Sequence, residues 1–78
     1  MRQKKLTLVI TFDTTTQAMA AEKFCMEQNL PGRIIPVPRE ITVGCGLSWK
    51  APPEAKEQLT DALRQGGLKW AACHLIEI

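Results

Sequence analysis

Cys45 lies between two glycines, Gly44 and Gly46, a few residues after the segment Pro36-Val37-Pro38-Arg39-Glu40. Glycine on both sides lets the backbone adopt positive φ angles and lets a reaction partner come close to the sulfur, which a cysteine that only fills a core does not need. The pattern therefore predicts a thiol that a loop presents for nucleophilic chemistry. The structural alternative is a tight turn with an incidental cysteine.

Thiol chemistry requires the thiolate. A thiol with a pKa of about 8.5 is roughly 3% ionised at pH 7, whereas a pKa of about 6.5 makes it roughly 75% ionised. Arg39 is the first candidate for the positive charge that would lower the pKa, and Lys50 is the second. The backbone amides around Gly44 and Gly46 are candidates for a small anion nest. Glu40 sets the local charge or steers a partner; the alternative is an exposed ion pair with Arg39, worth roughly 0–1 kcal/mol.

The other two cysteines are predicted to pack in the core. Cys25 falls on the apolar side of a predicted helix, and Cys73 alternates with apolar residues in the last predicted strand. A disulfide between either of them and Cys45 is left open. His74 follows Cys73, but adjacent strand residues point to opposite faces, and no C-x₂-C or H-x₃-H spacing occurs. We therefore predict no metal site.

The elements before this loop follow from periodicity. Apolar residues that alternate with threonine and valine predict a strand over residues 5–12. Asp13 or one of the threonines after it is predicted to cap a helix that runs to about Asn29. A second strand is predicted over residues 33–37, in which Pro36 lacks an N–H donor and so requires an edge position.

After the loop that contains Cys45, the sequence predicts a strand, a helix and a last strand. A short third strand is predicted over residues 47–50, and Pro52 or Pro53 opens a second helix that ends at Gly66-Gly67. A last strand follows over residues 70–78. The order βαββαβ is that of an α+β ferredoxin-like sandwich, a four-stranded antiparallel sheet with two helices on one face. Its second and fourth strands lie at the edges, which agrees with Pro36.

Size and composition predict one soluble domain over residues 1–78, with 45% hydrophobic and 23% charged residues. A net charge of +2 is too small to indicate nucleic-acid binding, and no apolar run of about 20 residues predicts a membrane span. The apolar stretch near the N-terminus is short, contains threonine and lacks a cleavage site, so we predict no signal peptide. Three cysteines without C-x-x-C spacing suit a reducing compartment, and we expect the protein in the cytoplasm.

The chain resembles a small bacterial family of selenium/sulfur carrier protein-like domains. The resemblance covers nearly the whole chain and implies a carrier whose Cys45 holds sulfur or selenium as a transient persulfide-type adduct, with no other cofactor. It rests on Ile35-Pro36-Val37-Pro38-Arg39-Glu40-Ile41 and Gly44-Cys45-Gly46-Leu47, with support from Thr16, Ala18 and Glu22.

Our first hypothesis is that Cys45 accepts the chalcogen from a cysteine desulfurase-type donor or a low-molecular-weight perselenide. An acceptor enzyme such as a selenophosphate synthetase then receives it. A second hypothesis is a docking or adaptor module for a sulfur or selenium enzyme, in which Cys45 is structural and the Pro-Arg-Glu segment is the contact surface. A peroxidase or reductase is weaker, because no clear second redox cysteine lies near Cys45.

The sheet face away from the helices is expected to be open, with Thr7, Val9 and Thr11 on it. These residues are not the aromatic platform of RNA-recognition domains, so we predict no nucleic-acid binding. The same face, with Val9 and with Trp49 or Trp70, is a candidate surface for a homodimer.

Overall fold

The structure is a computed structural model and describes residues 5–39, 41 and 46–78. All six predicted elements are present, and their bounds lie within about two residues of the predicted ones except at the start of the second helix, where a 3₁₀ turn occupies the predicted first residues and the α-helix begins at Lys56. They are β1 (Leu6–Thr11), α1 (Thr15–Glu27), β2 (Arg33–Pro36), β3 (Leu47–Ala51), α2 (Lys56–Gln65) and β4 (Ala72–Glu77), with a short 3₁₀ turn, η1 (Pro53–Ala55), before α2.

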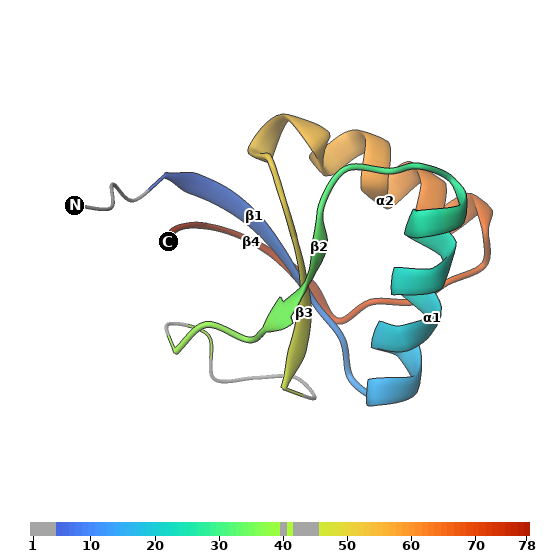
Figure 1. The fold of residues 1–78 in the computed structure, drawn as a ribbon, viewed down its shortest axis with the longest axis horizontal. Coiled ribbons are helices and arrows are strands. Elements are labelled where there is room, and N and C mark those ends of the chain that lie inside the picture. The colour runs from blue at the N-terminus through green and yellow to red at the C-terminus, as the bar shows by residue number, and fades with distance from the viewer. Residues whose placement is uncertain (1–4, 40, 42–45) are drawn as a thin grey trace.

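In the described part of the chain the four strands form one antiparallel sheet in the order β2-β3-β1-β4. Both helices cover the same face of this sheet (Figure 1). The α+β ferredoxin-like prediction is therefore confirmed. Pro36 ends β2, which is an edge strand, so its missing N–H costs the sheet no hydrogen bond.

Helix α1 begins with reciprocal side-chain bonds. The Thr14 hydroxyl accepts a hydrogen bond from the Gln17 N–H at 3.1 Å, and the Gln17 side chain accepts one from the Asp13 N–H at 3.1 Å. This arrangement resembles a capping box and satisfies amides that have no partner inside the helix. Asn29 follows the helix with φ 55°, a left-handed residue that ends it. The side chains that α1 buries are small: Ala18, Ala21 and Cys25.

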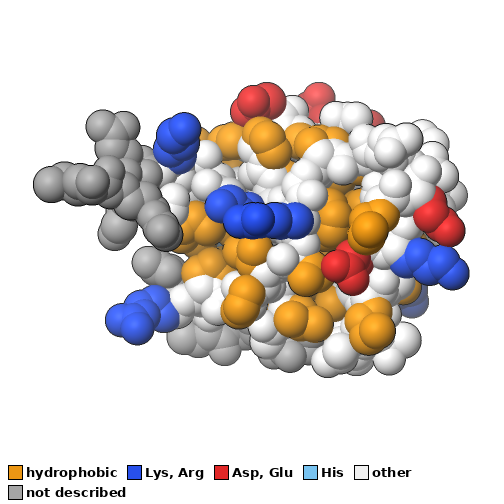
Figure 2. Space-filling model, viewed as in Figure 1, with side chains coloured by type: hydrophobic (Ala, Val, Ile, Leu, Met, Phe, Trp, Pro, Cys, Tyr) orange, Lys and Arg blue, Asp and Glu red, His pale blue; other side chains and the backbone are white. Residues whose placement is uncertain are grey.

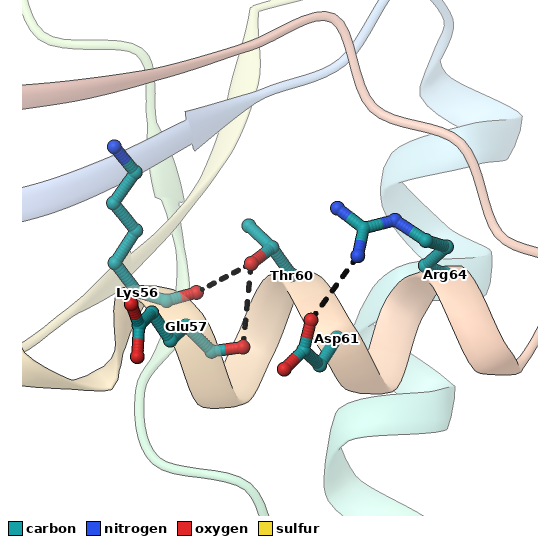
Figure 3. Close-up of polar contacts among 5 residues, drawn as sticks. All are labelled: Lys56, Glu57, Thr60, Asp61 and Arg64. Atoms are coloured by element: carbon teal, nitrogen blue, oxygen red, sulfur yellow. Dashed lines mark hydrogen bonds and ion pairs between the residues drawn. The ribbon is translucent and has the colours of Figure 1, made fainter.

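Helix α2 contacts the core through Leu59 and Leu63, which are 0% and 1% exposed. Its polar contacts lie within the helix itself (Figure 3). The Thr60 hydroxyl donates to the Lys56 carbonyl at 2.8 Å, and Arg64 pairs with Asp61 at 3.1 Å. The Arg64–Asp61 pair is largely exposed and contributes only about 0.3–0.5 kcal/mol. Burial of the two leucines therefore holds α2 on the sheet.

The face of the sheet away from the helices is not the open surface that we predicted. Val9 and Thr11 are 0% exposed and Thr7 is 6% exposed, although they alternate with the helix-side residues of β1. In the register, Val9 lies between Lys50 of β3 and His74 of β4. The long side chains of Lys50 and His74 flank Val9 and account for its burial, whereas the neighbours of Thr11 in the register are the small residues Ser48 and Ala72.

Trp49 also differs from the predicted surface position. It is 2% exposed, belongs to the helix-side core, and donates its indole N–H to the Pro31 carbonyl at 3.0 Å. Trp70 is partly buried against the same core. The prediction that Val9 and Trp49 form an oligomer surface is wrong, because neither side chain reaches the surface. A homodimer through other residues stays a prediction.

Candidate functional site

The predicted thiol loop connects β2 to β3. Beyond the last register pair, Pro36 with Leu47, the Val37 N–H donates to the Gly46 carbonyl at 3.0 Å. The two ends of the connection are therefore held together as a hairpin. Of the predicted site residues, Glu40, Gly44 and Cys45 lie outside the described residues, and their roles stay predictions.

Gly46 follows Cys45 directly and has a positive φ, one of the two properties for which glycine beside the cysteine was considered. Its φ is 95°, and a Cβ added there would meet no atom within 4 Å. Glycine is therefore needed for its backbone conformation and not for space. The residue is exposed, so the chain enters β3 from the surface of the molecule.

Arg39 lies in a turn on the first half of the connection. The Ile41 N–H donates to the Pro38 carbonyl at 2.9 Å, which closes this turn around Arg39. The Arg39 side chain is exposed, and within the described ranges it forms no ion pair.

Ile41 anchors this connection, a role that the sequence analysis missed. Its side chain is only 7% exposed, yet it is outside the helix-side core cluster. Figure 1 shows the segment after β2 on the side of the sheet away from the helices. The available signal was an isolated isoleucine between the polar residues Glu40 and Thr42.

Lys50, the second candidate for a charge near the thiol, is placed three positions along β3 from Leu47. Three strand residues span about 10 Å. Lys50 lies opposite Arg33 of β2 on one side and opposite Val9 of β1 on the other. Lys50 is therefore the neighbour of another base, Arg33, on the sheet and is not part of the β2–β3 connection.

The two described cysteines have raised pKa values. Burial raises the pKa of the Cys25 thiol to about 11, and Cys25 is 1% exposed in the core. Burial also raises the pKa of Cys73, against smaller opposite effects from the Lys56 charge and a hydrogen bond with Trp70. Both are free thiols, and the prediction that they pack in or against the core is confirmed. Neither is a ready thiolate at neutral pH.

His74 and Cys73 lie on opposite faces of β4, as predicted. Cys73 is in register with the core residue Ile10, and His74 with Val9. The His74 Nε2 atom is buried and has no hydrogen-bond partner among the described residues. No group of three potential metal ligands occurs in the described part of the chain.

The comparisons with known proteins give one match. Residues 7–75 match the family model described as "Putative Se/S carrier protein-like", a range that runs from β1 into β4 and includes the Cys45 motif. No curated protein and no solved structure matches the chain. None of the described helices is both long enough and apolar enough to span a membrane.

Proposed function

The chain belongs to the Se/S carrier protein-like family, and from this premise we propose that Cys45 carries selenium or sulfur as a perselenide- or persulfide-type adduct. The family match over residues 7–75 is the observation that carries the proposal, because it includes the glycine-flanked cysteine and the Pro-Arg-Glu segment. The high pKa of Cys25 and the raised pKa of Cys73 support it, since they favour the third cysteine as the reactive thiol.

Loading is a thiol exchange that balances without an added oxidant. The Cys45 thiolate attacks the terminal chalcogen of a donor R–S–SH or R–S–SeH. The new Sγ–S or Sγ–Se bond forms as the donor's bond to that atom breaks, and R–S⁻ leaves with the electron pair. The donor is a cysteine desulfurase-type enzyme or a low-molecular-weight perselenide.

Delivery is the same exchange in the opposite sense. A nucleophile of the acceptor, for which we propose a selenophosphate synthetase-type enzyme, attacks the outer atom, and Cys45 leaves as a thiolate. A leaving thiol of low pKa leaves faster, so a cation near the sulfur would assist both steps. We propose Arg39 for this role, because its side chain is exposed on the same connection.

Intact-protein mass spectrometry tests the proposal. Wild type, Cys45→Ser and Cys73→Ser are incubated with selenite and glutathione, or with a desulfurase and its substrate. We expect an added selenium or sulfur mass on wild type and on Cys73→Ser, the matched control, but not on Cys45→Ser. An adduct that persists on Cys45→Ser contradicts the assignment.

The docking module remains the second hypothesis, because exposed Arg39 lies in a turn that the Ile41–Pro38 bond closes. Cys45→Ala separates the two functions. If the variant binds a desulfurase as wild type does but no longer transfers chalcogen, the carrier function holds. If transfer is unchanged in the alanine variant, the adaptor function replaces it.

A further inference from the structure

A pocket of about 600 Å³ lies at the end of the sheet where β1 and β2 begin and β3 ends. This volume is within the range of about 300–1,000 Å³ that is common for small-molecule sites. Three bases and one acid line it, so its wall carries net positive charge. The lining residues used below are Lys5, Arg33, Lys50, Glu54, Pro52 and Pro53.

Two of the bases lie side by side on neighbouring strands of the sheet. Arg33 of β2 and Lys50 of β3 are in register, and both lie on the face away from the helices because their strand neighbours pack in the helix-side core. Like charges in this position repel each other. Among the described residues the only ion pair is Arg64 with Asp61, so Glu54 does not neutralise either base at salt-bridge distance. Figure 2, which has the view of Figure 1, shows basic side chains in the middle of the molecule on the side where β2 lies, with hydrophobic side chains around them.

The backbone beside these bases is tightly built. Gly32 has φ 114°, and a Cβ added there would collide with the Lys50 carbonyl oxygen and the Trp49 indole. The Trp49 indole N–H donates a 3.0 Å hydrogen bond to the carbonyl of Pro31, the residue before Gly32. The turn into β2 is thus fixed on β3, which holds the first residue of β2, Arg33, opposite Lys50. The backbone positions of the two bases are thus set before a ligand arrives, which lowers the ordering cost of binding an anion.

We propose that this pocket binds a small molecule with at least two anionic groups, carboxylate or phosphate, which bridge Arg33 and Lys50 with help from Lys5. The flanking Pro52 and Pro53 provide an apolar wall for a short carbon skeleton. The pocket size and Glu54 in its lining favour a compact ligand over an acidic protein segment. The proposal is independent of the carrier chemistry, because the pocket and the connection that holds Cys45 lie at opposite ends of β2 and β3.

Titration with pyrophosphate and with citrate tests the proposal, with NaCl at matched ionic strength as the reference. We expect each binding anion to raise the Tm of wild type above the NaCl reference and to shift the NMR signal of the Trp49 indole N–H. Trp70→Phe assigns the two indole signals. The anion with the lower Kd identifies phosphate or carboxylate as the preferred group.

Variants localise the effect. Arg33→Gln and Lys50→Gln should each raise the Kd at least tenfold, while Arg64→Gln, which removes a paired surface base, should leave it unchanged. Arg33→Gln without ligand should be at least as stable as wild type, since it removes a like-charge contact, and this outcome separates lost binding from lost folding. Cys45→Ser should bind as wild type does, so failure of the carrier function and failure of this proposal are distinguishable.

Three results would overturn the pocket assignment. One is a Tm rise no larger than that from NaCl, and another is an equal loss of affinity in Arg64→Gln. The third is binding of an acidic peptide of ten aspartates without binding of pyrophosphate or citrate, which would make the surface a protein-docking site.

Discussion

At the scale of single residues, the buried thiol of Cys25 links stability to pH. Its pKa is about 11 in the folded protein against 9.0 for the ordinary thiol. The unfolded chain therefore releases this proton first. The neutral Cys25 thiol therefore makes its full contribution to the free energy of unfolding below pH 9. This contribution, at most about 2.7 kcal/mol, is lost as the pH rises toward 11. Urea unfolding at pH 7, 9 and 10.5 measures it, and Cys25→Ser should show a smaller decline than wild type over this range.

Gly32 and Gly46 both have positive φ, but only at Gly32 would an added Cβ also collide with neighbouring atoms. Substitution of each by alanine therefore distinguishes the cost of a steric clash from the cost of backbone strain. Gly32→Ala should destabilise the protein by roughly 3 kcal/mol or more, because the new Cβ would collide with the Lys50 carbonyl as well as adopt a strained φ. Gly46→Ala meets no atom within 4 Å and should cost only roughly 1–2 kcal/mol of backbone strain. Chemical denaturation of both variants gives the comparison. Equal losses would show that the contact with β3 contributes nothing.

At the scale of elements, Thr14 determines where α1 begins. Thr14→Ala removes the acceptor for the Gln17 N–H and should lower the free energy of unfolding by about 1 kcal/mol. Thr14→Ser keeps the hydroxyl and should retain most of the stability. Thermal and urea unfolding of the two variants measure this difference in stability. A serine variant as unstable as the alanine variant would contradict the capping role.

The elements themselves could be predicted because each has a local cause. Alternation defines β1, a hydroxyl residue caps α1, and Pro36 requires an edge, which the strand order provides. What covers each face could not be predicted. Val9 is buried between Lys50 and His74, residues 41 and 65 positions later in the chain, which only the register brings beside it. Period two indicates which side chains share a face, but not whether that face is exposed.

The sequence predicts the Cys45 segment better than it predicts the basic pocket. The position of the Cys45 segment between two strands follows from the periodicity on either side, and Gly46 has a positive φ that glycine readily adopts. The basic pocket was not predictable. Lys5 precedes β1, Arg33 begins β2 and Lys50 is the next-to-last residue of β3, and no local pattern links them before the sheet has formed.

At the scale of the whole molecule, the carrier segment and the basic pocket should act independently. Gly46, the residue after Cys45, lies four positions from Lys50 along β3, a separation of about 13 Å. Effects of substitutions more than about 10 Å apart usually add. Arg33→Gln should therefore leave the yield of the chalcogen adduct from a low-molecular-weight perselenide unchanged, within about twofold. Mass spectrometry of wild type and Arg33→Gln, each with and without saturating pyrophosphate, measures this. A pyrophosphate-dependent change in the wild-type adduct that disappears in Arg33→Gln would show instead that the sheet couples the two sites, and that the anion regulates loading of the carrier.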